Sequence, residues 1–346
     1  MEEGTNRPIF VVGSPRSGTS ILTWCLGQHP NIFPVPESNW MGDFAINIAI
    51  GYQIGAARGE RSILSAMEIR EDELFAALGH SIHELILSHR ADLERKRQGA
   101  VTACGAKGRW FQARRSSSDP KNRWVDGTPE YSMYICGLRK LFPDARFIHI
   151  FRDVGAVVRS MLNFHRVAGT ELVSDEESAY KYWLRTVKAC VQAEQAYGPN
   201  AVCRVRYTDL VDSPEPVMRS VLDFLEEPYD PKCLEPLAQR INSSEVPVDF
   251  EFDGQAADPA IVEKATRLCA SVNETAQPRQ GSCAAAHEME TTFRERVKYM
   301  AAIDGAYQKT QQIIKALNRS GLPLYLITHA ALAIADPCAT VLSQLS

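Results

Sequence analysis

A glycine-rich loop near the start of the chain has the residue types of a phosphate-binding turn. In the segment PIFVVGSPRSGTS, Gly13 and Gly18 occupy the glycine positions of the pattern G-x-x-x-x-G-K-[ST], and Ser20 occupies its hydroxyl position. Thr19 stands where that pattern has a lysine, and Arg16 lies inside the loop. Backbone N–H groups followed by a helix N-terminus can bind a phosphate without the lysine.

The missing lysine narrows the class of ligand. That lysine normally directs its charge at a β- or γ-phosphate, so its absence disfavours a nucleoside triphosphate bound with magnesium. A nucleotide with one 5′-phosphate followed by a single further anionic group, such as a sulfuryl group, fits the loop better. Arg16 can then lie against the bridging oxygen and stabilise the charge that develops there when the bond breaks.

A second candidate anion site follows a predicted buried strand in the middle of the chain. In the segment FIHIFRDVGAVVRSM, Arg152 ends the apolar run and Ser160 lies about two helical turns into the segment that follows. An arginine at the carboxyl end of a parallel strand and a hydroxyl on the next helix can converge on one phosphate. Arg159 is an additional cation beside them.

These motifs resemble those of the PAPS-dependent sulfotransferases, where PAPS is 3′-phosphoadenosine 5′-phosphosulfate. The loop resembles the family's strand–PRSGT[ST]–helix motif, and Arg152 with Ser160 resembles its 3′-phosphate motif, although Val154 stands where proline is usual. The segments VDGTPEYSMYICGLRKLFPDARFIHIFRD and VRYTDLVDSPEPVMRSVLDFLEEP resemble two further family blocks. The four blocks follow the family order across roughly residues 8–230, so the chain resembles a bacterial or carbohydrate-type soluble member.

The resemblance implies a donor and the residues that bind it. PAPS would supply a sulfuryl group to a hydroxyl or amine of a small-molecule, carbohydrate or carrier-bound acceptor, with no metal ion required. The residues implied in binding PAPS are Arg16, Ser17, Gly18, Thr19 and Ser20 at the 5′-phosphosulfate, Arg152 and Ser160 at the 3′-phosphate, and Tyr207 of the last block. Arg16 is also implied in catalysis, at the leaving phosphate oxygen.

One departure from the family pattern concerns a lysine. Some relatives carry a lysine before the Thr-Pro pair that helps to polarise the sulfonate, whereas this chain reads Asp126-Gly127-Thr128 there. The role then falls to Arg16 alone or to a basic residue of the polar, serine-rich stretch 101–121. The candidates in that stretch are Arg114, Arg115 and Lys121.

Attack by a hydroxyl or amine requires a base within hydrogen-bond reach of the attacking atom. Glu37 is the preferred candidate, because carbohydrate-type and bacterial relatives place a catalytic glutamate in this segment. Its neighbours Pro36 and Trp40 favour desolvation, which raises the pKa of a carboxyl group. The alternative is a histidine, as in the cytosolic aryl and steroid relatives, with the candidates His80, His83, His89 and His165.

Other side chains are candidates for supporting roles around the acceptor. Asp126 and Glu130 are candidates for orienting the acceptor or the base. Large aromatic side chains line many ligand clefts. The candidates for lining the acceptor cleft are Trp40, Phe44, Trp110 and Phe111.

The elements that must position these residues alternate between strand and helix. Apolar, β-rich runs at residues 9–12, 123–127, 145–153 and 201–207 predict strands, and helical patterns follow them. Strand, glycine loop and helix in this order open a nucleotide-binding α/β sheet. We therefore predict an α/β fold, in which a P-loop-like parallel sheet is flanked by helices.

Two helical additions to this sheet are expected. One is a helical insertion at about residues 40–100, whose predicted apolar stripe consists of Leu74, Leu78, Ile82, Leu85 and His89. Beyond residue 253 the sequence is small, polar and poorly periodic until a predicted long helix at 288–318. We predict a sulfotransferase domain at residues 1–252 and a helical C-terminal extension at 253–346, acting as a lid or a dimerisation element.

Composition limits the partners and the location that we expect. A net charge of -4 and a pI of about 6.1 give no global attraction to nucleic acid or to an anionic membrane. Nine cysteines without a C-x-x-C pair, and no signal peptide ahead of the first strand, predict reduced thiols in the cytoplasm. The apolar run at 322–335 is shorter than the ~20 residues of a membrane span.

Two other classes of function stay open at this point. A P-loop nucleotide kinase or related phosphotransferase would need a lysine after Gly18 and an acid that holds magnesium, so Thr19 argues against it. A non-catalytic binding protein with the PAPS fold would bind the nucleotide without turnover, and its C-terminal helices would serve a homodimer. The sequence leaves the identity of the acceptor open, because acceptor-binding regions vary independently of the fold.

Overall fold

The computed structural model describes residues 7–90, 92, 119–238, 246 and 254–319, and a parallel sheet of five strands forms its centre. The strands are β1 (Ile9–Val12), β2 (Ile32–Pro34), β3 (Arg123–Asp126), β4 (Arg146–Phe151) and β5 (Val202–Arg206). Their order across the sheet is β2-β3-β1-β4-β5, so the glycine loop after β1 lies at the middle of the carboxyl edge. The predicted α/β fold with a parallel sheet is confirmed, whereas the short edge strand β2 was not predicted.

Helices cover both faces of the sheet, as a parallel sheet requires. One face packs against α1 (Thr19–Gly27), α10 (Tyr207–Asp212), α11 (Pro214–Leu225) and the 3-10 helix η4 (Pro231–Ala238). The other face packs against α2 (Trp40–Ala56), α4 (Glu71–Ser88), α6 (Ile135–Leu141), α9 (Glu176–Tyr197) and α13 (Cys283–Arg319). A smaller core joins α9 to α7 (Val154–Leu162) and α12 (Pro259–Glu274).

The alternation of side chains along β1 explains the two large cores. Ile9 and Val11 pack into the core beneath α1 and α11, whereas Phe10 points to the opposite face. There its ring lies edge-on to Trp124 at 5.5 Å and stacks on Phe147 at 5.2 Å between ring centroids. All four residues of β1 are buried, so the strand that carries the loop is fixed from both sides.

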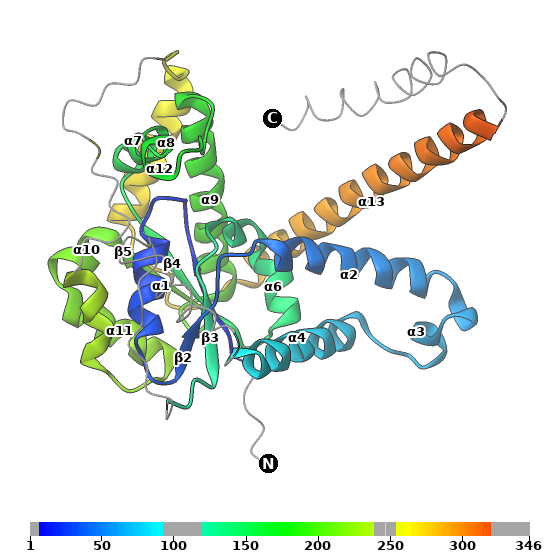
Figure 1. The fold of residues 1–346 in the computed structure, drawn as a ribbon, viewed down its shortest axis with the longest axis horizontal. Coiled ribbons are helices and arrows are strands. Elements are labelled where there is room, and N and C mark those ends of the chain that lie inside the picture. Colours follow the sequence, from blue (N-terminus) through cyan, green and yellow to red (C-terminus); the bar gives the residue numbers. More distant parts are fainter. Residues whose placement is uncertain (1–6, 91, 93–118, 239–245, 247–253, 320–346) are drawn as a thin grey trace.

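The described part of the insertion contains the α-helices α2, α4 and the short α3 (Ile63–Ala66), with the 3-10 helix η1 (Gly59–Arg61) between α2 and α3. Figure 1 shows α2 and α13 extending together away from the sheet, with α3 near the outer end of α2. The predicted stripe on α4 ends earlier than expected: Ile82 is buried, but Leu85 is 60% exposed and His89 lies past the last helical residue. The pattern was extended too far because, among the described residues, nothing covers Leu85 in the last turns of α4.

The C-terminal part differs from its prediction in one helix. The stretch that reads as small and polar contains α12, which begins after the capping residue Asp258 and buries the small side chains of Ala265, Cys269 and Val272. Helix α13 begins at Cys283 rather than at residue 288. The predicted boundary near residue 252 lies outside the described residues, so the division into two domains stays a prediction.

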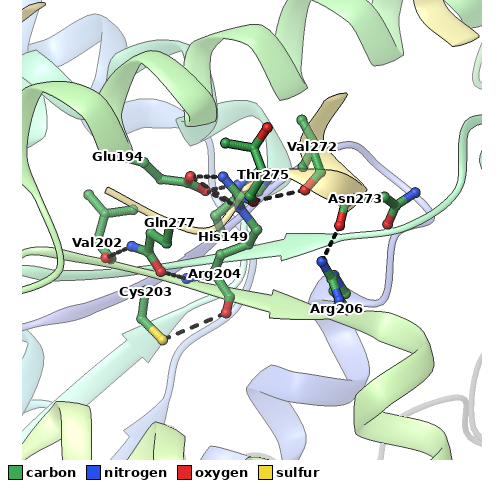
Figure 2. A network of polar contacts seen from close by, with 10 residues as sticks. All are labelled: His149, Glu194, Val202, Cys203, Arg204, Arg206, Val272, Asn273, Thr275 and Gln277. Carbon is green, nitrogen blue, oxygen red and sulfur yellow. Dashed lines mark hydrogen bonds and ion pairs between the residues drawn. The ribbon is translucent and has the colours of Figure 1, made fainter. Parts of the chain in front are cut away.

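A network of charged side chains fastens the end of α12 to the sheet (Figure 2). Glu194 of α9 is fully buried and accepts a hydrogen bond of 2.6 Å from Nδ1 of His149 on β4. Arg204 of β5 donates to Glu194 and, at 2.9 Å each, to the carbonyls of Val272 and Thr275. Because these carbonyls end α12, the network joins three layers of the protein.

The predicted absence of a membrane span can be examined only within the described ranges. None of the helices there combines the length and the apolarity needed to cross a membrane.

Candidate active site

The glycine loop between β1 and α1 requires its two glycines. Gly13 has φ +150 and a Cβ added to it would lie 2.5 Å from the carbonyl oxygen of Ile150. Gly18 has φ +106, and its added Cβ would lie 2.6 Å from the ring of Tyr207. The loop is therefore packed directly against the ends of β4 and β5, and a side chain at either glycine would push it away.

Arg16 has a left-handed backbone conformation, with φ 70, which is uncommon for a residue with a side chain. Two contacts hold it there. Its carbonyl accepts a hydrogen bond of 3.1 Å from Nη1 of Arg152, and its own Nε donates to Oγ of Ser160 at 3.2 Å. The guanidinium also lies 5.0 Å from the centre of the Phe164 ring. The loop and the second anion motif are thus in direct contact.

Two arginines of like charge meet at this point. Burial lowers the pKa of Arg16, and the neighbouring charge of Arg152 lowers it further, while Glu37 and Tyr207 act in the opposite direction. The guanidinium of Arg152 in turn lies 4.4 Å above the ring of Tyr207. A bound anion would relieve the repulsion between the two cations, so the electrostatics favour an anionic ligand at this edge of the sheet.

The loop also has the polar groups that an anion needs. The hydroxyls of Ser14 and Ser17 are buried and have no hydrogen-bond partner among the described residues. Helix α1 begins after Gly18 without a side-chain cap and without an acid in its first turn. Because an uncapped helix N-terminus attracts negative charge, the residues present fit a phosphate or phosphosulfate group.

Glu37 lies beside the beginning of α1. Its Oε1 accepts a hydrogen bond of 3.2 Å from Oγ of Ser20, and the residue keeps contact with solvent. Desolvation by the surrounding protein raises the pKa of Glu37, and the charge of Glu130 adds to this, whereas the Ser20 bond and the charge of Arg16 oppose it. The carboxylate is therefore placed next to the cationic loop with its pKa moved toward neutral pH.

The sequence around these residues matches a known protein family. A model described as the sulfotransferase family matches residues 8–231 of the chain. The chain belongs to the sulfotransferase family. The match contains the loop, Glu37, Arg152, Ser160 and Tyr207.

Relatives with curated names are distant and longer. The chain is 26% identical over 231 residues to protein-tyrosine sulfotransferase 1 of Danio rerio, covering 65% of this chain and 55% of that protein. It is 25% identical over 227 residues to protein-tyrosine sulfotransferase 1 of Homo sapiens, covering 65% of this chain and 53% of that protein. An uncharacterized protein of Aquifex aeolicus (strain VF5) is 25% identical over 234 residues, covering 67% of this chain and 27% of that protein. The chain thus spans about half, or less, of the length of these three relatives.

Solved structures of sulfotransferases are also similar to the chain. The sulfotransferase domain of the Synechococcus PCC 7002 olefin synthase is 19% identical with a TM-score of 0.41, covering 83% of this chain and 94% of that chain. Sulfotransferase STF9 from Mycobacterium avium is 18% identical with a TM-score of 0.42, covering 80% of this chain and 79% of that chain.

The histidine candidates of this sulfotransferase lie apart from the loop contacts. His83 is buried, its Nδ1 accepts a hydrogen bond of 3.2 Å from Nε1 of Trp124, and burial lowers its pKa. His80 is exposed on α4, and His89 is exposed 3.7 Å from Asp92. His165 donates through Nδ1 to the carbonyl of Leu162 at 3.0 Å. Glu37 is the candidate base with a hydrogen bond to the loop.

Lys121 lies far from the glycine loop. Its Nζ is buried before the start of β3 and donates to the carbonyls of Gly27, His29 and Ile32, at the end of α1 and the start of β2. This is the amino edge of the sheet, opposite to the glycine loop, so Lys121 is ruled out as one of the candidates for polarising the sulfonate. Its positive charge instead stabilises the C-terminus of α1. Arg114 and Arg115 lie outside the described residues.

Of the remaining candidates, Asp126 and Glu130 act on Glu37 through their charges. Asp126 is fully buried, and Glu130 accepts a hydrogen bond of 2.7 Å from the hydroxyl of Tyr182 on α9. Trp40 is 46% exposed and its ring centre lies 5.5 Å from that of Phe44. Trp110 and Phe111 lie outside the described residues. Arg159, on α7 beside Ser160, is exposed.

Two contributors to the site were not predicted. Phe164 lies against the guanidinium of Arg16, and Tyr182 donates a hydrogen bond to Glu130. In each pair the two residues are far apart in the sequence. Neither Phe164 nor Tyr182 belongs to a motif with fixed spacing, so no signal in a single sequence identifies them. The described part of the chain holds no cluster of three or more His, Cys, Asp or Glu side chains placed for a metal ion.

Proposed function

We propose that the chain transfers a sulfuryl group from PAPS to a hydroxyl or amine of an acceptor. The single observation that carries this proposal is the position of Glu37. This carboxylate is hydrogen-bonded to Ser20 of a phosphate loop that has Arg16 and no lysine. A carboxylate suited to act as the base and a cation suited to stabilise the leaving oxygen are thus near enough for their charges to act on each other.

PAPS would be held at both ends by residues that already contact one another. Ser17, Gly18, Thr19 and Ser20 at the N-terminus of α1 would bind the 5′-phosphosulfate through backbone N–H groups and hydroxyls. Arg152 and Ser160 would bind the 3′-phosphate, with Tyr207 packed between Gly18 and Arg152. The uncapped helix, the buried hydroxyls and the two adjacent arginines support this assignment.

The reaction is an in-line displacement at sulfur. The bond from the acceptor oxygen or nitrogen to sulfur forms as the bond from sulfur to the bridging phosphate oxygen breaks. Glu37 takes the proton of the acceptor, and Arg16 stabilises the negative charge on the departing phosphate oxygen. The products are the sulfated acceptor and adenosine 3′,5′-bisphosphate, and the residues named require no metal ion.

Calorimetry separates this proposal from its two alternatives. Titration with adenosine 3′,5′-bisphosphate and with ATP–Mg²⁺ compares the two ligand classes, and preference for ATP–Mg²⁺ would favour a phosphotransferase. A non-catalytic binding protein would bind the bisphosphate but release none of it from PAPS with any acceptor. We expect tight binding of the bisphosphate and turnover that depends on Glu37.

The acceptor class is open to direct measurement. Curated relatives named protein-tyrosine sulfotransferases make a tyrosine side chain a candidate beside small molecules, glycans and carrier-bound intermediates. Incubation of the protein and labelled PAPS with a crude metabolite pool, and separately with tyrosine-containing peptides, would show the acceptor as a sulfo mass gain. A cytoplasmic location and a homodimer through the C-terminal helices are further proposals, which fractionation and light scattering would test.

A further inference from the structure

The segment that carries Glu37 is bound to the end of the neighbouring strand. Strands β2 and β3 are paired side by side up to Pro34 and Val125, and the N–H of Val35 donates to the carbonyl of Val125 at 3.0 Å. Beyond that point the two segments no longer pair with each other, and β3 ends one residue later at Asp126, so side chains continue the connection. The N–H of Ser38 donates to Oγ1 of Thr128 at 3.0 Å.

Asp126 is the centre of this connection. Its Oδ1 accepts from the N–H of Thr128 at 2.9 Å and from Oγ1 of Thr128 at 2.6 Å. Because the Thr128 hydroxyl donates its one proton to Asp126, its lone pairs are left to accept the N–H of Ser38. The Ser38 hydroxyl also donates to Oδ2 of Asp126 at 3.4 Å. A single carboxyl group thus orders both the threonine and the serine.

The turn around Glu37 needs such a constraint. Asn39 has a left-handed conformation with φ 48, and α2 begins at the next residue. Glu37 itself is exposed, so packing alone does not fix it. By contrast, Asp126 is 0% exposed and Thr128 is 1% exposed, and the hydrogen bonds that described residues make to Asp126 come from neutral donors. A buried carboxyl group without a cation among these donors is costly to keep, which points to a role beyond packing.

We propose that Asp126 is a positioning residue for Glu37. Through its hydrogen bonds with Thr128 and Ser38, Asp126 fixes the turn that places Glu37 beside Ser20. The proposal rests on the function proposed above, in which Glu37 is the base. Within the described part of the chain, the hydrogen bonds to Asp126 come from Thr128 and Ser38 and not from the donor loop. Asp126 acts by fixing the direction of two hydrogen bonds, and its charge determines how strongly they hold.

The charge of Asp126 depends on few groups. Among the described residues, the titratable side chains that face it are Glu37, from the segment before α2, and Tyr131, from the 3-10 helix η3 (Pro129–Tyr134). Burial raises the pKa of Asp126 to about 7, and the charge of Glu37 adds to the effect, while the hydrogen bonds from Thr128 and Ser38 oppose it. Above about pH 7 the ionised carboxylate binds Thr128 more strongly and, by repulsion, makes Glu37 a stronger base.

The first test needs no acceptor. In protein labelled with ¹³C at the glutamate carboxyl carbons, the Glu37 signal is identified by its loss in Glu37→Gln. We expect this signal to titrate with a second inflection at about pH 7 in the wild type, and to lose that inflection in Asp126→Asn. An identical Glu37 titration in the wild type and in Asp126→Asn would overturn the proposal.

The second test measures release of adenosine 3′,5′-bisphosphate from PAPS in the presence of a crude metabolite pool. Asp126→Asn and Thr128→Val are expected to lower this rate roughly 10- to 100-fold, because small misplacement of a base is costly. Thr128→Ser, which keeps the hydroxyl, should restore it. We expect calorimetric binding of the bisphosphate to change by less than about twofold in all three variants, because the donor loop is not altered.

Asp175→Asn is the matched control, because Asp175 also accepts from a backbone N–H and a hydroxyl, those of Ser178 at 2.7 and 2.6 Å. It should leave the rate and the Glu37 titration unchanged. Loss of rate in Asp126→Asn together with an equal loss of bisphosphate binding would show a merely structural role and overturn the proposal. If Glu37→Gln keeps the wild-type rate, the proposed function fails instead, and the Glu37 titration still decides the role of Asp126.

Discussion

Nε of Arg16 donates a hydrogen bond to Oγ of Ser160 at 3.2 Å, although 144 positions separate the two residues in the chain. The contact joins the loop after β1 to the helix after β4, which are neighbours because β1 and β4 pair in the sheet. One arginine therefore lies at the meeting point of both predicted anion sites. A nucleotide with a phosphate at each end of one adenosine matches this arrangement better than a ligand with a single anionic group.

Replacement of Arg16 tests the cation at the transfer point. Arg16→Ala should lower the rate of bisphosphate release from PAPS roughly 10²- to 10³-fold, the usual loss when a group that stabilises developing charge is removed. Arg16→Lys keeps the charge but not the Nε donor to Ser160, so it should recover only part of the rate. Steady-state rates with saturating PAPS provide the measurement. Full activity in Arg16→Ala would rule out the assigned role.

Glu37→Gln removes the proposed base while keeping the side-chain size. We expect the rate to fall roughly 10²- to 10⁴-fold, because general base catalysis contributes this much. Glu60→Gln, in the exposed 3-10 helix η1, is the matched control and should be silent. Rates of both variants at one pH decide the matter, and a Glu37→Gln variant as fast as the control would refute the assignment.

The pH dependence of the wild type follows from the environment of Glu37. Its pKa is raised, first by desolvation and then by Glu130, above the ordinary value of 4.5. Since the ionised carboxylate is the form that accepts a proton, activity should be lost as pH falls through this raised pKa, above the pH at which an ordinary glutamate protonates. A pH–rate profile measures this limb. A profile that stays flat down to the ordinary value would contradict the account.

Gly18→Ala tests the close packing of the loop on Tyr207. The new Cβ would lie 2.6 Å from the Tyr207 ring at a residue with φ +106, so we expect a loss of about 1–3 kcal/mol in unfolding free energy and of nucleotide binding. Gly59→Ala separates the two causes, because Gly59 has φ +56 but nothing within 4 Å of its added Cβ. Denaturant unfolding and calorimetry should show a smaller loss of stability and unchanged binding in the control.

The buried network in Figure 2 predicts the acid stability of the fold. Burial alone would raise the pKa of Glu194, but hydrogen bonds and charges from His149 and Arg204 outweigh it and hold the pKa below 4.5. The stabilisation is complete above pH 4.5 and is lost as pH falls through the lowered pKa. Glu194→Gln should cost about 3–5 kcal/mol at neutral pH and remove this part of the acid dependence. Unfolding curves of the wild type and of Glu194→Gln at several pH values would measure this difference in stability. Equal curves for the two proteins would disprove the prediction.

The parts of the site that could be predicted from the sequence are those carried by contiguous motifs. Gly13, Gly18 and Arg16 belong to one loop, and Arg152 with Ser160 to one strand and helix, so local spacing was enough to predict where they lie. Their binding of PAPS stays a prediction. Lys121 shows the limit of such reasoning. Its charge and its place in a basic stretch suggested the active site, but the start of β3 carries it to the opposite edge of the sheet.

The missed elements have physical reasons of their own. Strand β2 has three residues and ends at Pro34, so its pattern is too short to be recognised, and its pairing with β3 defines it. Helix α12 buries small residues, so its apolar face is weak in sequence, while its packing on α7 and α9 and the bonds from Arg204 fix it. Both depend on partners distant in sequence, and a single sequence does not reveal these.

The most direct test of the central claim is calorimetric titration of the wild type, Arg152→Ala and Ser160→Ala with adenosine 3′,5′-bisphosphate and with adenosine 5′-monophosphate. The account predicts that the wild type binds the bisphosphate at least about tenfold more tightly, since charge-assisted bonds to a phosphate contribute roughly 1.5–3 kcal/mol each. It also predicts that either substitution reduces this difference. Equal binding of the two nucleotides by the wild type, or a preference unaffected by both substitutions, would contradict it.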